Sequence, residues 1–486
     1  MGGTKPKGSK NREFPFAPRV INPAPIAHVV IFSAEEAVRK EAGVLEKEMP
    51  WLTVHHFSDP LSVSAFQSDK PVVFLLDDMS LSFVDTDRIR ENNRDGVIVL
   101  LSASDVVHRS PPAVAEEKHP HIRRADLIFA INDLEFRPSR ILPAAVRAAE
   151  DLININKYSR ARRYIFLIVD DEPRWFSQFL PVLYKIIGQR AAVRLTRTYE
   201  ETLRFLFGVE HEEDIDEEEF FLRGRGDDVV CLITDVFFPQ GDLTRTVAGV
   251  DLIKLIHRFY PRIPAIIASK AKEAEGQRDK AFILPKGDPE AIQIFRDYIY
   301  DYTGMGDFIL SRRDGSLIRR IKHVGDLYDI ILEAEKETEE AEELRSVLEE
   351  YGRRDYFSTW FYMHGFREMA DELRPRRDRG RRLISVLKRH LQREMIKTSR
   401  TPLLLGELKI HSLSELREGL KTAKPENIQR LSDSDVFSTW LEQNCYPELA
   451  EELRPIHGSG EPLRDVLIGI LDLWLPRYSL RVPPSE

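Results

Sequence analysis

Short apolar runs alternate with segments of helical periodicity through the middle of the chain. Five continuous apolar runs predict strands at 163–169, 191–196, 229–234, 263–268 and 281–284. Between and after them, apolar residues recur every three or four positions and predict helices at 175–188, 199–207, 248–259 and 289–302. Continuous apolar strands that alternate with helices are typical of a parallel sheet covered on both faces. We therefore expect an α/β domain at 160–303, with Gly188 as the C-cap of its first helix.

The same alternation occurs earlier, at 26–155. Strands are predicted at 27–32, 52–57, 71–78, 96–104 and 125–133, and the last helix at 139–153. The first 25 residues are rich in basic residues, Gly and Pro, and we expect a disordered tail there. The chain therefore begins with a tail and a second α/β domain.

The C-terminal half contains an internal repeat. Residues 355–375 and 435–455 are identical at 11 of 21 positions, at an offset of 80. Each copy ends in an amphipathic helix, and a short hairpin is predicted to open the first copy, turning at Asp314 and Gly315. We predict two mainly helical modules, 304–400 and 401–480, that stack so that each buries the other's apolar face. The shared Phe357, Trp360, Phe437 and Trp440 are expected in their cores.

Composition excludes several classes of protein. The chain of 486 residues has a net charge of −9, which gives no overall attraction to nucleic acid or anionic membrane. Its two cysteines exclude a disulfide framework and fit a reducing cytoplasm. No apolar run reaches the roughly 18–20 residues that span a bilayer. We expect a cytoplasmic protein without a membrane segment.

Five polar residues follow or end the strands predicted at 160–303. They are Asp170, Asp171, Asp235, Ser269 and Lys286. In a doubly wound sheet, ligands bind beyond the carboxyl ends of the strands, so these side chains should meet. Acids, a hydroxyl and an ammonium in one place are what a phosphorylatable carboxylate with bound Mg²⁺ requires.

This segment resembles the receiver domains of two-component response regulators, over the whole of 160–303. The resemblance implies that Asp235 accepts the phosphoryl group, and that Lys286 and Ser269 contact it. It also implies that Asp170, Asp171, Asp235 and the backbone carbonyl of Phe237 hold Mg²⁺. The chain departs from the family at Gly287, where a proline is usual, and at Ile283, where a switching aromatic is common.

The N-terminal domain resembles a degenerate receiver. Asp77 or Asp78 ends the strand that would carry the phosphoacceptor, and Ser102 ends the next. We expect Phe32 and Ser33 where the two first-strand acids should be. Ile131 and Asn132 occupy the region of the missing lysine. This is interpreted as a pseudo-receiver used for packing, dimerisation or partner binding.

The C-terminal modules weakly resemble helical modules of receiver-bearing proteins related to pyruvate, phosphate dikinase. They suggest a protein-binding output, and such an enzyme is one candidate for the downstream partner. A basic run at 374–400 offers an alternative, in which the chain binds DNA as a transcriptional regulator. The run lacks a helix-turn-helix pattern, so a solvated face, or an electrostatic dock for the acidic segment at 209–219, is preferred.

The leading hypothesis is a non-enzymatic response regulator that takes phosphate from a sensor histidine kinase or a phosphotransfer protein. Its fold class is two flavodoxin-like (βα)5 domains followed by the duplicated helical region. A phosphorylation-independent scaffold is the third hypothesis, and a homodimer remains open.

Overall fold

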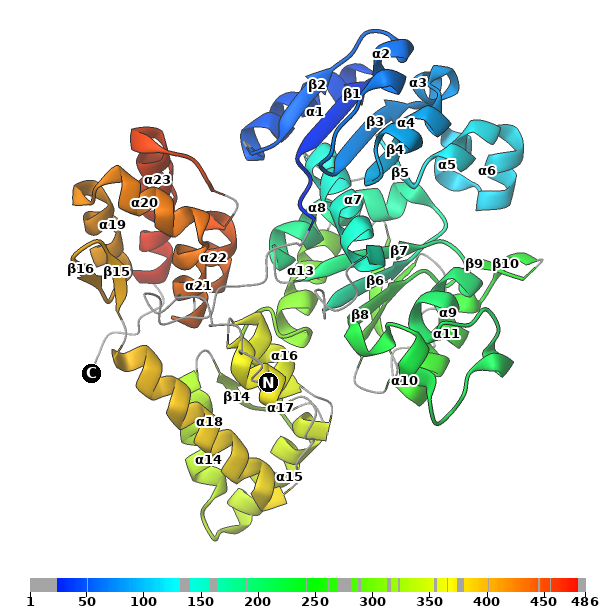
Figure 1. The fold of residues 1–486 in the computed structure, drawn as a ribbon. Coiled ribbons are helices and arrows are strands. Elements are labelled where there is room, and N and C mark those ends of the chain that lie inside the picture. Colours follow the sequence, from blue (N-terminus) through cyan, green and yellow to red (C-terminus); the bar gives the residue numbers. More distant parts are fainter. Residues whose placement is uncertain are drawn as a thin grey trace, which may run out of the picture. The chain divides into compact units, whose positions relative to one another are not determined.

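The computed structural model describes most of the chain. The described residues are 24–49, 51–131, 140–157, 164–188, 191–241, 243–260, 263–269, 281–286, 290–312, 316–321, 324–353, 356–364, 366–373, 380–400, 402–444, 446–454 and 456–479. They divide into two compact units, one ending at Gly306 and one beginning at Asp307 (Figure 1). Both predicted α/β regions lie in the first unit, and both repeats lie in the second. The predicted tail lies almost wholly outside the described residues.

The first lobe, residues 24–157, is built on a five-stranded parallel sheet of order β2-β1-β3-β4-β5. Its strands are β1 (His28–Phe32), β2 (Thr53–His56), β3 (Val72–Asp77), β4 (Gly96–Ser102) and β5 (Leu127–Ala130). Its helices are α1 (Glu36–Glu48), α2 (Pro60–Ala65), α3 (Asp78–Phe83), α4 (Thr86–Asn92), α5 (Asp105–Arg109), α6 (Pro112–Lys118), η1 (Pro120–Arg124) and α7 (Ile141–Lys157). Every residue of β3 is buried, as expected for a central strand covered on both faces.

The second lobe, residues 164–303, contains a parallel sheet of the corresponding order β12-β11-β8-β6-β7. Its strands are β6 (Ile165–Val169), β7 (Ala192–Thr196), β8 (Val229–Thr234), β11 (Ala265–Ser269) and β12 (Phe282–Pro285). The helices are α8 (Pro173–Ile187), α9 (Tyr199–Phe207), η2 (Glu212–Asp214), α10 (Phe220–Arg223), η3 (Gly226–Asp228), α11 (Ala248–Phe259) and α13 (Ala291–Tyr302). The predicted strands and helices of this lobe are present, with ends shifted by up to two residues. Gly188 caps α8 at a φ of 49°, as predicted.

One element of the second lobe was not predicted. Strands β9 (Phe238–Gln240) and β10 (Leu243–Thr246) form an antiparallel hairpin between β8 and α11. The amide of Gly241, at the end of β9, donates to Glu200 Oε1 of α9 at 2.7 Å. The loop after β8 is therefore extended and anchored to the neighbouring helix.

Helices α7 and α8 hold the two lobes together. Helix α7 contacts β4 and β5 of the first sheet and β7 of the second, and it packs on α8 (Figure 1). Asp151 of α7 is fully buried, and its Oδ2 accepts from the Val193 amide at 2.8 Å and the Tyr184 hydroxyl at 3.0 Å. From the first sheet, the Ala130 amide donates to Ser177 Oγ of α8 at 3.0 Å. Both helices are buried along nearly their whole length, so the lobes share one interior.

The two sheets share the register of their first and third strands. Phe32 pairs with Leu76 in the first sheet, and Val169 pairs with Thr234 in the second. The residues that follow these pairs are therefore equivalent, so Asp77 corresponds to Asp235. The two positions after Phe32 correspond to the two acids after Val169.

This register corrects one prediction. Ser33 and Ala34, rather than Phe32 and Ser33, stand where Asp170 and Asp171 stand in the second sheet. The error arose because an apolar residue at a strand end does not reveal by pattern alone whether the strand still continues there.

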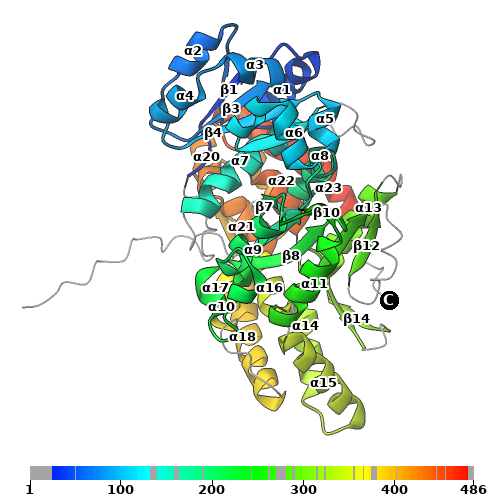
Figure 2. The same ribbon diagram turned by 90° about the vertical axis from the view of Figure 1, so that its right-hand side faces the viewer.

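The second unit consists of two modules. The first has β13 (Phe308–Ser311), β14 (Leu317–Ile321), α14 (Val324–Ala334), α15 (Glu339–Arg353), α16 (Tyr356–Met363), α17 (Arg367–Leu373) and α18 (Gly380–Arg400). The second has β15 (Leu403–Leu405), β16 (Leu408–Ile410), α19 (Leu413–Thr422), α20 (Pro425–Asp433), α21 (Val436–Gln443), α22 (Pro447–Leu453) and α23 (Gly460–Ser479). Helices α14, α15 and α18 pack against one another (Figure 2). The predicted hairpin is present as β13 and β14, and its turn lies outside the described residues.

Each module closes over a core of its own. Phe357 and Trp360 are buried in the first core and Phe437 and Trp440 in the second, as predicted. Among the described residues, no member of one core cluster belongs to the other. The prediction that the copies bury each other's apolar faces therefore finds no support in the described part of the unit, because each set of helices already covers its own apolar residues.

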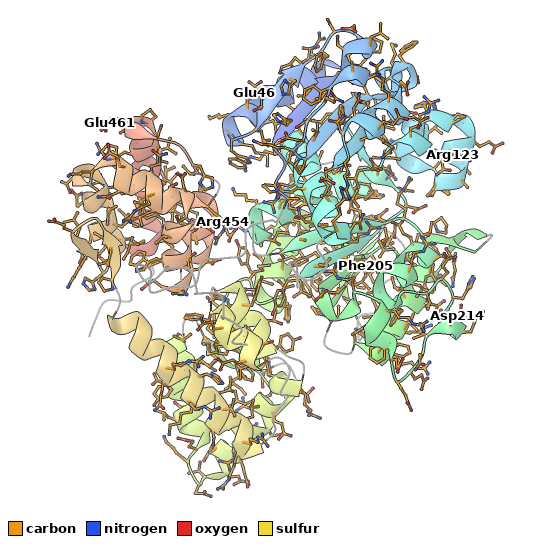
Figure 3. All side chains as sticks on the ribbon, viewed as in Figure 1. Glu46, Arg123, Phe205, Asp214, Arg454 and Glu461 are labelled. Carbon is orange, nitrogen blue, oxygen red and sulfur yellow. The ribbon has the colours of Figure 1, made fainter. Side chains whose placement is uncertain are left out.

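Part of the repeated motif is a buried ion network. Arg454 lies in the second module (labelled in Figure 3). It is 5% exposed and contacts Asp435 through Nη1. Its Nη2 lies 2.9 Å from Glu442 Oε1 and 3.0 Å from Glu451 Oε1. The equivalent Arg374 lies outside the described residues. The shared Asp and Arg are therefore structural in the second copy.

The basic run at 374–400 is described from residue 380. Lys388 lies 2.5 Å from Glu335, Arg381 2.9 Å from Glu337 and Arg393 3.3 Å from Glu372. These cations on α18 are paired within their own module.

Within the described ranges, no helix is both long enough and apolar enough to cross a membrane.

Candidate functional site at the carboxyl edge of the second sheet

The structure brings the predicted polar residues of the second lobe to one edge of its sheet. Asp170 and Asp171 follow β6, Asp235 follows β8, Ser269 ends β11, and Lys286 follows β12. Strand β6 lies between β7 and β8, so the chain reverses its winding direction beside the acidic pair. Such a switch point is where doubly wound sheets bind ligands. The side chain of Asp235 is 14% exposed, more than those of Asp170 and Lys286.

Lys286 joins two of the carboxylates. Its Nζ lies 2.6 Å from Asp170 Oδ2 and 2.7 Å from Asp235 Oδ2, and only 2% of its side chain is exposed. The Lys286 amide also donates to the Ser269 carbonyl at 3.2 Å, which ties β12 to β11 at this edge. An ammonium that bridges two buried carboxylates is held by charge-assisted hydrogen bonds on both sides.

The site carries an excess of negative charge. Three carboxylates and one ammonium sum to −2 when all are ionised. Burial raises the pKa of Asp170 to about 7, and the nearby Asp235 and Asp171 add to this while Lys286 opposes it. Burial, Glu172 and Asp235 raise the pKa of Asp171 to about 6. Burial alone would lower the pKa of Lys286, but the Asp170 and Asp235 carboxylates raise it.

Main-chain groups hold the carboxylates in place. Asp235 Oδ1 accepts from the Val236 amide at 2.6 Å, and Asp170 Oδ1 accepts from the Glu172 amide at 3.0 Å. Helix α11 approaches the Asp235 backbone closely, since a Cβ built on Gly249 would lie 1.8 Å from the Asp235 carbonyl oxygen. Only glycine fits at that position. The edge is therefore fixed before any ligand arrives.

Trp175, Glu172 and Arg197 were not predicted as part of the site. The Trp175 ring centroid lies 4.9 Å from Lys286 Nζ, and its indole Nε1 donates to Glu172 Oε2 at 2.7 Å. Arg197, directly after β7, donates from Nη2 to the Asp171 carbonyl at 2.9 Å. Trp175 was predicted only as an apolar residue of a helix. Its position directly after the acidic segment, in Asp-Asp-Glu-Pro-Arg-Trp, was the one available signal.

The roles predicted for Ser269 and for the Phe237 carbonyl stay predictions. Ser269 is buried at the end of β11, and the contact of its hydroxyl with a phosphoryl group stays a prediction. Phe237 packs against the core of the second lobe, and the role of its carbonyl stays a prediction. Phe282, beside Ile283, stacks on Tyr298 at 4.3 Å between ring centroids. Gly287 lies outside the described residues.

The donor set suits a hard divalent cation in its chemistry. Carboxylate oxygens are the ligands that Mg²⁺ prefers, and two positive charges would cancel the excess charge of −2. Across the described residues, however, no three acidic, His or Cys side chains are grouped so that they could hold a metal ion. Two of the three carboxylates are bonded to Lys286 instead. A cation would therefore compete with the ammonium for the same oxygens.

A small cavity adjoins Asp170 between the sheet and α8. Its lining includes Asp170, Thr234 and Phe176, and its volume is about 10 Å³. That is the space of a single water molecule, far below the size of typical ligand pockets. This cavity does not accommodate a small metabolite.

The first lobe carries the same corner without a lysine. Asp77 Oδ2 accepts from Ser33 Oγ at 2.8 Å and the Ala34 amide at 2.7 Å, and Oδ1 accepts from the Ser80 amide at 2.7 Å. Burial alone would raise the pKa of Asp77. The hydrogen bonds outweigh the effect of burial, so the pKa of Asp77 is lowered. The neighbouring Asp78 accepts instead from Ser102 Oγ at 2.8 Å. In this lobe, hydroxyl and amide groups hold the Asp77 carboxylate by hydrogen bonds, whereas in the second lobe the Lys286 ammonium holds the Asp235 carboxylate.

A comparison with models of protein families found no match, and neither did a comparison with curated proteins.

Proposed function

We propose that the chain is a response regulator whose second lobe accepts a phosphoryl group on Asp235. The observation that carries this proposal is the Lys286 ammonium held between Asp170 and Asp235 at a sheet edge whose three carboxylates and one ammonium sum to −2 when all are ionised. An unrelated structural ion pair would need neither a third carboxylate nor the partial exposure of Asp235. The proposal also implies that both lobes are flavodoxin-like receiver folds, the first of them inactive.

The geometry suggests which oxygen reacts. The Val236 amide holds Asp235 Oδ1, so Oδ2 is the oxygen that would attack phosphorus. With acetyl phosphate as donor, a bond forms between Oδ2 and phosphorus, the bond from phosphorus to the acetate oxygen breaks, and acetate leaves. Lys286 already contacts Oδ2, so its ammonium would pass to an oxygen of the new phosphoryl group. The Ser269 hydroxyl would hydrogen-bond another.

Asp170, Asp171 and Asp235, with the Phe237 carbonyl, would hold Mg²⁺. The ion would neutralise the carboxylates and the incoming phosphoryl oxygens, which otherwise repel one another. Arg197 would keep the acidic loop in place through the Asp171 carbonyl. The ordinary donor would be the phosphohistidine of a sensor kinase or a phosphotransfer protein, and the chain would act in the cytoplasm.

The duplicated helical unit would provide the output by protein contact, and a dikinase-like enzyme is one candidate partner. The alternative of DNA binding through 374–400 gains no support, since described cations of α18 are paired within their module. A scaffold that works without phosphorylation is the remaining alternative.

The test is mass spectrometry of the intact chain after incubation with acetyl phosphate and Mg²⁺. Wild type and Asp77→Asn should gain a phosphate adduct, and Asp235→Asn should not. An adduct of equal size in Asp235→Asn would refute the assignment of the acceptor. Absence of an adduct from every variant, also with a panel of phosphorylated histidine kinases as donors, would favour the scaffold.

A further inference from the structure

The side chains around Lys286 form a closed ring of contacts. Lys286 Nζ bonds to Asp170 Oδ2, and Asp170 Oδ1 accepts from the Glu172 amide. Glu172 Oε2 accepts from the Trp175 indole, and the face of that indole returns to Lys286 Nζ at 4.9 Å. The Lys286 ammonium, Asp170, Glu172 and Trp175 are therefore linked by contacts that begin and end at the ammonium.

Trp175 is buried and fixed from several sides. It is 3% exposed and lies in the first turn of α8, the helix enclosed between the two lobes. The guanidinium of Arg174 lies 4.6 Å from the indole centroid, and Arg174 Nε also bonds to Glu172 Oε2 at 3.0 Å. An indole held in this way offers its negative face to a desolvated cation, where such contacts are strongest.

We infer that Trp175 is a positioning residue that holds the Lys286 ammonium in line with Asp235, which rests on the proposed phosphorylation of Asp235. The Asp235 carboxylate cannot do this throughout the reaction, because it loses its charge at Oδ2 when the phosphorus–oxygen bond forms, and Asp170 would be shared with Mg²⁺. The indole face does not change in that step. It gives the ammonium a constant contact while its carboxylate partner becomes a phosphoryl group.

The matched control lies on the same helix. Tyr184 of α8 also carries a cation on its ring, the Arg147 guanidinium at 5.2 Å, but it is far along the helix from the site. Tyr184→Leu therefore removes a buried ring, its cation contact and its hydrogen bond to Asp151 without touching Lys286. Trp175→Phe keeps a ring face for Lys286 and removes only the indole donor, whereas Trp175→Leu removes both.

The first measurement is the initial rate of phosphorylation by acetyl phosphate with saturating Mg²⁺. We expect Trp175→Leu to lower this rate about tenfold, Trp175→Phe to keep it within about threefold, and Tyr184→Leu to leave it unchanged. Thermal unfolding of each variant accompanies the rates. A wild-type rate in folded Trp175→Leu would overturn the proposal while leaving Asp235 as the acceptor.

The second measurement needs no phosphorylation. In protein labelled with ¹³C at lysine Cε, the Lys286 signal, assigned with Lys286→Arg, should show an upfield ring-current shift. The shift should persist in Trp175→Phe and Tyr184→Leu and vanish in Trp175→Leu. A wild-type Lys286 signal without this shift would overturn the proposal, even if no donor phosphorylated the chain. A chain that takes up no phosphate but retains the shift would refute the proposed function and leave only the contact.

Discussion

Ile131 occupies in the first sheet the position that Lys286 occupies in the second. The amide of each donates to the carbonyl of the serine that ends the preceding strand, at 3.0 Å to Ser102 and at 3.2 Å to Ser269. The backbone frame is thus the same, and one side chain is apolar while the other is a buried ammonium. Chemistry at the two edges differs through side chains alone.

Asp77→Asn should destabilise the protein without affecting phosphate uptake. The carboxylate accepts three hydrogen bonds that an amide cannot fully replace, so we expect a loss of about 1–3 kcal/mol in the free energy of unfolding at pH 7. Because the folded pKa lies below the ordinary value of 3.8, this contribution is present above that pH and is lost as the pH falls below it. Urea titrations at pH 7 and pH 3 would check this, and equal losses at both would contradict it.

Asp171→Asn should have the opposite effect. The folded chain holds this proton up to about pH 6, whereas the unfolded chain releases it near 3.8, so the folded chain binds more protons between these values. Stability therefore falls as the pH rises through that window, and removing the charge should stabilise the protein by about 1–3 kcal/mol at pH 8. The measurement is urea unfolding in EDTA at pH 4 and pH 8. If the variant were no more stable than wild type at pH 8, the negative charge of Asp171 would not destabilise the folded chain, and the prediction would be wrong.

Asp151→Ala should weaken the junction of the two lobes. The change leaves the Val193 amide and the Tyr184 hydroxyl buried without their shared acceptor, and we expect a loss of about 1–3 kcal/mol. Wild type should unfold both lobes in one calorimetric transition, since α7 and α8 are interior to both. Two separate transitions in wild type would show that the lobes are independent. Asp297→Ala, on the exposed surface of α13, is the control and should leave the transition in place.

Arg454→Met should be the most damaging single change in the second unit. It leaves Asp435, Glu442 and Glu451 buried without a counter-charge, which costs about 3–5 kcal/mol. Thermal unfolding would show a large fall in the melting temperature. Arg417→Met, at the exposed pair with Asp472, should change it little. Similar small effects of both would mean that the network is not stabilising.

The sequence predicted the frame of the second lobe because its strands are continuous apolar runs bounded by polar residues. Asp170, Asp171, Asp235 and Lys286 were located because strand ends of a parallel sheet share one edge. Trp175 was not predicted as part of the site, since a tryptophan on a buried helix has the same pattern whether it packs on leucine or on an ammonium.

Other features depend on contacts that periodicity does not encode. Helix α8 was predicted from its helical periodicity, which does not show that the first lobe covers the face that would otherwise meet water. Hairpin β9–β10 was not predicted, because its strands are short and mixed in polarity. The register at Ser33 depended on where β1 stops, which only its pairing with β3 decides.

The equivalence of the two edges extends to a small local bond. The Glu35 amide donates to Ser33 Oγ at 3.1 Å, just as the Glu172 amide donates to Asp170 Oδ1 at 3.0 Å. One polypeptide thus presents a corner with a buried ammonium and an equivalent corner without one, at equal concentration and in the same solution. An assay of the second corner can therefore be read against the first, where Ile131 stands in place of the lysine.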